Sequence, residues 1–192
     1  MNKTIKTVLL AMAMMPCAMQ AQSLKDLFLQ MPVTVCPSLT EYNRLELVDN
    51  QKNGKEMLTR NAFHTNSTMK ELTDDFAQLS VSDSSEKIFK LLTKKDGTKI
   101  IMVISKVLCD DISDSSVAFY STDWQPLDAR TYIEEPVSEE FRQIEIDKEN
   151  DLLIVTTYNP LALQTDGSDN PVEQTSVSHV LQWDGTSFKV QS

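Results

Sequence analysis

The sequence has little of what most catalytic and metal-binding motifs require. Its 192 residues include four glycines, three cysteines and two histidines. It contains no glycine-rich phosphate loop, no G-x-S-x-G nucleophile elbow and no H-E-x-x-H zinc motif. The cysteines form no C-x-x-C pair, which argues against a dithiol redox site and against a zinc ribbon. We therefore predict no cofactor.

Positive charge is also scarce. Eighteen lysines and arginines stand against 28 acidic residues, which gives a formal net charge of −10 and a pI near 4.6. A nucleic-acid-binding protein needs a basic surface to displace counterions, and docking on anionic lipid needs a basic patch. The composition therefore predicts no nucleic acid among the partners. Beyond the N-terminal region no apolar run approaches about 18 residues, so we expect no transmembrane segment in the mature chain.

Residues 1–22 have the order of features that is typical of a signal peptide. Lys3 and Lys6 precede an apolar run at residues 8–15, and a proline with small or polar residues follows. We expect cleavage near Ala21 and a single domain over residues 23–192. The mature protein should then be periplasmic or at the cell surface.

The cysteines allow two further predictions. Lipid attachment at Cys17 is disfavoured, because Pro16 occupies the position where a lipoprotein signal needs a small residue. Cys36 and Cys109 remain after cleavage, and the oxidising compartment outside the cytoplasm permits a disulfide between them. Spacing alone does not establish that bond, and two buried free thiols are the favoured alternative.

The apolar pattern predicts two helices at the N-terminus. Ser23 can cap the first, whose Leu24, Leu27, Phe28 and Met31 recur at helical spacing. For the second, S-x-x-E at residues 38–41 reads as a capping box, and Asn53-Gly54 as its end. Four residues form the expected inward stripe of this second helix: Leu39, Tyr42, Leu45 and Val48.

After about residue 70 the pattern changes to the alternation that is typical of strands. Asp96-Gly97 is a strong hairpin signal, and a second Asp-Gly turn stands at residues 184–185. The apolar run Ile100–Ile104 indicates a central strand buried on both faces. We predict an α+β fold in which the two helices pack on a mainly antiparallel, meander-like curved sheet of about seven to nine strands.

Candidate catalytic groups are few or unspecific. His64 and His179 are the two histidines, and a hydrogen-bonded structural role is the better interpretation of each. Paired carboxylates could support glycosidase chemistry, but acidic pairs are expected in any acidic protein and most fall on turns. The pairs are Asp74-Asp75, Asp110-Asp111, Glu134-Glu135 and Glu139-Glu140. We therefore predict no catalytic residue.

Metal and ligand candidates come from loops and aromatic residues. Asp110, Asp111 and Asp114 offer oxygen ligands for calcium, although the spacing is not that of an EF-hand and plain turns are favoured. A second acidic loop holds Asp166, Asp169 and Asn170. The residues that could contact a ligand are Tyr42, Arg44, Trp124, Trp183 and His179. Core packing is the alternative for the tryptophans.

Several segments resemble those of a known protein family. They are D-L-F-L-Q-M-P at residues 26–32, L-T-E-Y-N-R-L-E-L-V-D at 39–49, L-T-D-D-F at 72–76 and the closing Q-W-D-G-T-S-F-K. The chain is similar in these to a family of uncharacterised exported proteins of Gram-negative gut and oral anaerobes, a domain of unknown function. The resemblance implies a periplasmic or surface location and no particular reaction.

Three functional hypotheses follow. The first is a non-enzymatic binding or assembly module of the cell envelope, whose partner is an envelope protein or a glycan. The second is a small envelope hydrolase, which would need a cleft with two facing carboxyl groups about 5–9 Å apart. The third is a small-ligand carrier with Trp124 or Trp183 lining a cavity.

Overall fold

The computed structural model describes residues 22–109, 112–133, 142–158 and 176–191. Within these ranges lie two α-helices, α1 (Leu24–Gln30) and α2 (Glu41–Lys52), and one turn of 3-10 helix, η1 (Ala129–Thr131). Neither α-helix is long and apolar enough to cross a membrane. The strands are β1 (Leu58–Arg60), β2 (Asn66–Leu72), β3 (Phe76–Ser82), β4 (Ser85–Thr93), β5 (Lys99–Cys109), β6 (Ile112–Ser121), β7 (Pro126–Leu127), β8 (Arg142–Asp147), β9 (Leu152–Tyr158), β10 (Ser176–Trp183) and β11 (Phe188–Val190).

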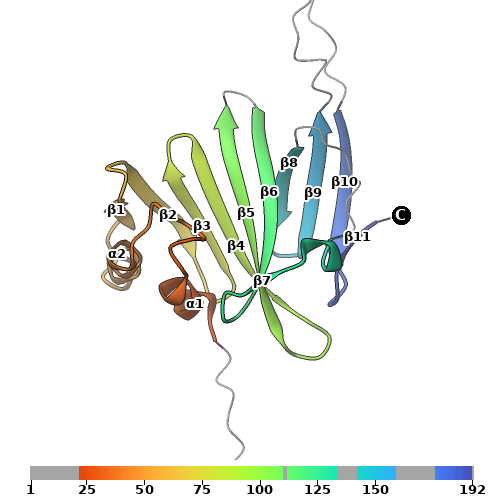
Figure 1. The fold of residues 1–192 in the computed structure, drawn as a ribbon, viewed down its shortest axis with the longest axis horizontal. Coiled ribbons are helices and arrows are strands. Elements are labelled where there is room, and N and C mark those ends of the chain that lie inside the picture. The colour runs from red at the N-terminus through yellow and green to blue at the C-terminus, as the bar shows by residue number, and fades with distance from the viewer. Residues whose placement is uncertain (1–21, 110–111, 134–141, 159–175, 192) are drawn as a thin grey trace, which may run out of the picture.

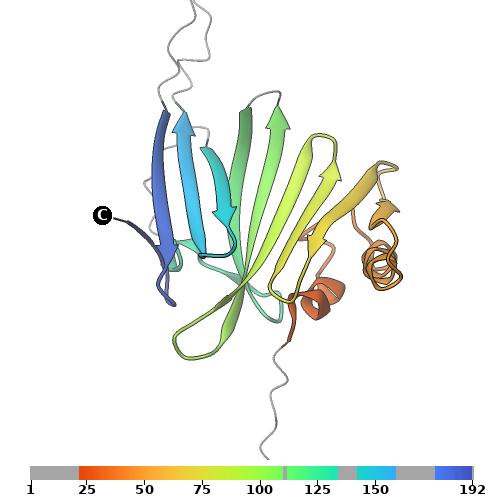
Figure 2. The ribbon, with the colours of Figure 1, turned by 180° about the vertical axis from the view of Figure 1, so that it is seen from behind.

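The predicted α+β fold is confirmed, and the strands divide into two sheets. The first sheet has the order β1-β2-β3-β4-β5-β6-β7 and the second the order β11-β10-β9-β8, so both are meanders in which every neighbouring pair is antiparallel. Figure 1 shows the helices at the β1 end of the first sheet and the second sheet at the opposite end. Figure 2 shows the same order from behind.

The first helix forms as predicted. Ser23 caps it, since its hydroxyl accepts from the Asp26 backbone N–H at 3.2 Å and the Asp26 side chain bonds back to the cap residue. Leu24, Leu27 and Phe28 are buried.

The second helix differs from the prediction in its start and in its buried face. Thr40, not Ser38, is the cap, and its capping-box partner is Asn43. Tyr42 and Leu45 are exposed, whereas Asn43, Arg44, Leu47 and Val48 are buried. Hydrogen bonds of a buried polar side chain explain which face of α2 is buried. The Asn43 amide donates to the Thr59 hydroxyl at 2.8 Å and to the Arg60 carbonyl at 3.0 Å, and these bonds hold α2 against β1. The spacing of apolar residues in the sequence gives no indication of such a hydrogen bond.

The first sheet has a core on each face. Alternate residues of β5, such as Ile101 and Val103, pack against the helices, and Ile100, Met102 and Ile104 pack toward the second sheet. All five are buried, which confirms that Ile100–Ile104 is a central strand covered on both sides. The first sheet therefore shares one core with the helices and the other core with the second sheet.

Both Asp-Gly turns form where the sequence predicts them. Gly97, between β4 and β5, has a φ of 81°, and Gly185, between β10 and β11, has a φ of 85°. Only glycine adopts this left-handed region at little cost. In each turn the aspartate also accepts from the threonine two residues on, which fixes the loop.

Candidate functional site

The tryptophans serve as core residues rather than as the walls of a cavity. Trp124 is 5% exposed, its indole N–H donates to the Leu27 carbonyl at 3.0 Å, and its ring packs edge-on against Phe89. Trp183 is also buried and donates to the Thr93 carbonyl at 2.9 Å. Each therefore joins separate elements of the fold, and the carrier hypothesis receives no support from either one.

The other sequence-derived ligand candidates are scattered. Tyr42 is exposed on α2, whereas Arg44, two residues later on the same helix, is buried. Arg44 Nη1 donates to the Leu39 carbonyl at 2.9 Å, and burial lowers its pKa. His179 lies half-buried in β10, in the second sheet. The structure does not bring these residues together.

The structure describes only some of the residues that were predicted for the metal site and for the disulfide. Asp114 is exposed on β6, while Asp110 and Asp111, like the acidic loop at 164–171, lie outside the described residues. No cluster of three metal-ligating side chains occurs in the described ranges. Cys36 is a buried free thiol, and the side chain of Cys109 lies outside the described residues.

Of the four acidic pairs, only Asp74-Asp75 lies within the described ranges. Asp75 belongs to an ion-pair cluster that connects the two sheets: Lys90 of β4 contacts it at 2.8 Å, Asp151 at 3.1 Å and the Lys148 carbonyl at 2.9 Å. Lys148 in turn pairs with Glu71. Every carboxylate in this cluster faces a lysine.

This charge balance is the opposite of what a general acid needs. Burial by itself raises the pKa of Asp75, but the hydrogen bond from Lys90 and that from Thr73 outweigh it, so the pKa falls below its usual value. A catalytic acid needs a raised pKa to carry its proton at neutral pH. The cluster is therefore a structural clamp between sheets, and it gives no support to the hydrolase hypothesis.

The structure also contains a surface hollow that no sequence pattern predicted. We call it the Cys36–Lys87 groove. It has a volume of about 400 Å³ and lies between the segment after α1, the β1–β2 turn and the β3–β4 hairpin. Its lining residues are Cys36, Pro37, Ser38, Asn61, Phe63, Thr65, Val81, Ser82, Ser85 and Lys87.

Asn61 holds one wall of the groove. Its side-chain oxygen accepts from the backbone N–H groups of Phe63 and Thr65, at 3.0 and 3.2 Å. Its amide nitrogen lies within hydrogen-bonding distance of Ser67 and of the Val81 carbonyl, which anchors the turn to β2 and β3. The turn therefore has a fixed shape, and it presents Phe63 with 66% of its surface exposed.

Lys87 supplies the single charged group among the lining residues. It continues the row of Phe89 and Leu91 on the helix-covered face of β4, at the open end of that core. Its Nζ donates to the Ser105 hydroxyl at 2.7 Å across the β4–β5 pair. On the opposite side of the groove, the Cys36 thiol lies 3.4 Å from the Ser38 hydroxyl.

Lys87 and Lys90 differ in their electrostatic surroundings although both belong to β4. Burial lowers the pKa of Lys87, and the electrostatic interaction with Cys36 opposes this only in part. Burial also acts to lower the pKa of Lys90, but Asp75 and Asp151 outweigh it and raise the pKa above its ordinary value. Lys90 is thus a paired cation, whereas Lys87 is a partly desolvated one.

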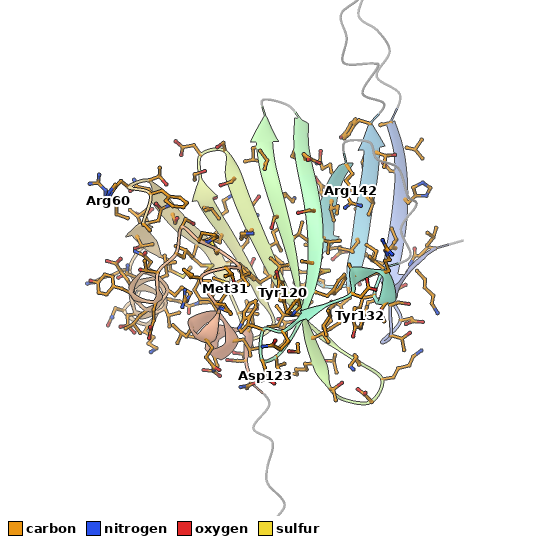
Figure 3. The ribbon with its side chains drawn as sticks, in the orientation of Figure 1. Met31, Arg60, Tyr120, Asp123, Tyr132 and Arg142 are labelled. Atoms are coloured by element: carbon orange, nitrogen blue, oxygen red, sulfur yellow. The ribbon has the colours of Figure 1, made fainter. Side chains whose placement is uncertain are left out.

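A second, more polar hollow adjoins the groove. It is lined by Arg60, His64, Thr65, Asn66, Ser82, Asp83 and Ser84 and has a volume of about 660 Å³. Thr65 and Ser82 belong to both hollows. Figure 3 shows Arg60 at the outer margin of the molecule, beside β1 and β2. In the described structure no hydrogen bond joins the imidazole of His64 to a serine or to Asp83.

Neither the charge nor the shape of the Cys36–Lys87 groove could be predicted from the sequence pattern. Lys87 reads as the polar position of an alternating strand, and Phe63 as a residue of a turn. The one signal was the run of turn-forming residues around Asn61–Thr65, which does not reveal that the turn closes over Cys36.

The chain therefore has an α+β fold with two meander sheets joined by ion pairs, and its described residues form an apolar surface groove. The same fold occurs in the structure of a domain of an uncharacterized protein from Porphyromonas gingivalis W83, with a TM-score of 0.72 and 20% sequence identity over 88% of this chain and 97% of that chain. The chain belongs to the family described as "Protein of unknown function (DUF3256)", which it matches over residues 17–186. A comparison with curated proteins finds no match.

Proposed function

We propose that the protein is an exported, non-enzymatic binding module of the cell envelope, and that its ligand or partner binds in the Cys36–Lys87 groove. The observation that carries the proposal is the groove itself. Ligand sites are typically concave and mostly apolar, with a few polar groups that fix orientation, and their volumes are about 300–1,000 Å³. The groove has this character, with one cation and a mainly apolar lining of about 400 Å³.

The exposure of Phe63 supports the same location. A phenylalanine with 66% of its surface in water gains nothing from that position in the isolated protein. The turn that carries it is held by the buried Asn61, so the ring is presented on a fixed support. Pre-formed aromatic contacts of this kind reduce the entropy that binding loses.

The arrangement of the described ionisable groups favours binding over catalysis. A nucleophile and its base must lie within about 2.6–3.2 Å of one another. Within the described ranges, no hydrogen bond joins Cys36 or a serine to either histidine, and the Asp75 cluster is neutralised by lysines. The Cys36–Lys87 groove thus supports the proposed binding role, and the lack of turnover is proposed with it.

Export is proposed from the sequence. The lysines, apolar run and small residues of positions 1–22 support a cleaved signal peptide. Fractionation of cells followed by N-terminal sequencing should recover the protein outside the cytoplasm, beginning close to residue 22. Recovery of a cytoplasmic protein that retains Met1 would contradict export and leave the groove proposal intact.

Site-specific photo-crosslinking tests the binding proposal. A benzophenone amino acid replaces Phe63 in one variant and Tyr42 in another, and both are irradiated in the cells that make the protein. Tyr42 is the matched control, because it is an aromatic residue of similar exposure, 70%, that lies outside the groove. We expect a discrete adduct at position 63 that is absent at position 42. Equal labelling, or none, at the two positions would refute the proposal.

A further inference from the structure

We infer that the Cys36–Lys87 groove binds a small organic carboxylate, with the carboxylate at the Lys87 amine and the apolar body against Phe63 and Val81. This inference rests on the proposed function, because it names the ligand class of the same groove. The inference follows from the charge of the residues that line the groove, from the hydrogen bonding of Lys87 and from the size of the groove.

The charge of the groove is unusual for this protein. The chain carries 28 acidic residues, yet none of the ten residues that line the groove is acidic and one, Lys87, is basic. Arg44 is not among the lining residues, but it interacts electrostatically with Cys36, which is one of them. An anion in the groove would therefore meet the Lys87 cation, whereas a cation would be repelled by it.

Lys87 has unused bonding capacity. An ammonium group carries three donors, and the described contacts of Lys87 Nζ consist of one hydrogen bond, to the Ser105 hydroxyl. Lys90, on the same strand, has a full set of acceptors, because its ammonium group contacts two carboxylates and a carbonyl. Among the described residues Lys87 has no carboxylate partner. A ligand carboxylate would supply the missing acceptor and stabilise the charged form of the amine.

The remainder of the hollow suits an apolar body of modest size. Phe63, Val81 and Pro37 supply the apolar surface, and the volume of about 400 Å³ is near the lower end for ligand sites. A single short chain or one ring fits this space better than a two-chain lipid does. The adjoining hollow at Thr65 and Ser82 provides room for a polar group at the far end.

Isothermal titration calorimetry with three probes of equal chain length tests the inference. The probes are octanoate, octanol and octylammonium, each below its aggregation concentration. The variants are Lys87→Met, Lys87→Arg and Lys52→Met. Lys52→Met is the control, because this substitution removes the same charge from an exposed position on α2 outside the groove.

We expect the wild-type protein to bind octanoate at least tenfold more tightly than octanol, and octylammonium least. Lys87→Met should lower octanoate affinity about tenfold or more and leave octanol affinity unchanged. Lys87→Arg should retain octanoate within about threefold, and Lys52→Met should match the wild type. The arginine variant keeps the test informative if the methionine variant fails to fold.

Two outcomes would overturn the inference. One is equal affinity for octanoate and octanol in the wild type, and the other is no binding of octanoate at all. Neither outcome decides the proposed function, because crosslinking at position 63 reports an occupant of any chemistry. A position-63 adduct together with no carboxylate preference would retain the groove as a site and reject its assignment to carboxylates.

Discussion

Lys87 and Lys90 lie three residues apart on β4, and replacing Lys90 with methionine should lower the free energy of unfolding, whereas replacing Lys87 should not. The side chains point to opposite faces of the sheet and have different partners. Methionine keeps the length and apolar stem of lysine and removes the charge. The pair therefore isolates what the charge contributes at each position.

Lys90→Met should destabilise the protein by about 2–3 kcal/mol. The lysine is 6% exposed and makes an ion pair with each of two carboxylates and a hydrogen bond to the Lys148 carbonyl. Hydrogen bonds to charged groups contribute about 1.5–3 kcal/mol each when buried. The Asp75 and Asp151 side chains are 57% and 39% exposed, so solvent screens their share and the sum is well below three such bonds.

Lys87→Met should leave stability unchanged or raise it by up to about 1 kcal/mol. The substitution removes one hydrogen bond, to Ser105, which contributes about 1 kcal/mol. It also removes the cost of holding an amine in a partly buried site without a described carboxylate partner. Gains of this size at the expense of function are common where a binding site holds a destabilised group.

Urea denaturation at several pH values measures both effects. Because burial lowers the pKa of Lys87, the unfolded state binds more protons than the folded state between that pKa and 10.5. Stability therefore rises with pH in this window, and any gain from Lys87→Met is largest below it. The pKa of Lys90 is raised, so its contribution is complete below 10.5 and is lost as pH rises through the folded pKa. The titratable and charged groups beside Lys87 and in the adjoining hollow are Cys36, Arg60, His64 and Asp83.

Equal destabilisation by the two substitutions would refute this reasoning. It would mean that Lys87 is a structural cation like Lys90, and that the groove needs no ligand to explain it. A gain in stability for Lys90→Met would refute the role of the clamp between the sheets instead.

Three further predictions concern the fold. Trp124→Phe should cost about 1–2 kcal/mol by urea denaturation, because the ring contacts with Phe89 survive while the hydrogen bond to the Leu27 carbonyl is lost. Asn61→Ala should cost about 3 kcal/mol and abolish the position-63 adduct, since two backbone N–H groups of the turn lose their acceptor. Thr40→Ala should cost about 1 kcal/mol in the same assay, as for other helix caps, and an unchanged midpoint would show that Thr40 does not cap α2.

Most of the fold could be predicted from the sequence because its strands and turns have strong local signals. The Asp-Gly turn at residue 97 demands a left-handed glycine, and an unbroken apolar run demands two covered faces. The division into two sheets could not be predicted. It depends on how far the first sheet extends before the second packs across its face, which is a property of tertiary packing rather than of periodicity.

The second helix shows where pattern analysis fails. Leu39, Tyr42, Leu45 and Val48 form a regular stripe, but Tyr42 and Leu45 lie in solvent. The helix is oriented by Asn43, whose amide reaches Thr59 and Arg60 on β1. A residue distant in sequence thus selects the face, and a buried polar side chain leaves no hydrophobic signal.

The candidate site could not be predicted at all from the pattern. Its two walls come from segments around Cys36 and around Asn61, and its charge comes from one lysine in an alternating strand. Only the fold brings these together. Trp124 and Trp183, which the sequence offered either as ligand contacts or as core residues, are bonded into the core by their indole N–H groups.

The most direct test of the account is to observe Lys87 itself while a ligand binds. Lysine 13Cε resonances can be followed by NMR as octanoate and then octanol are added, with Lys87→Arg used to assign the signal. We expect octanoate to shift the Lys87 resonance more than that of any other lysine, and octanol to shift it much less. An unmoved Lys87 resonance, or equal shifts at exposed lysines such as Lys52, would contradict the assignment of this groove as the binding site for carboxylates.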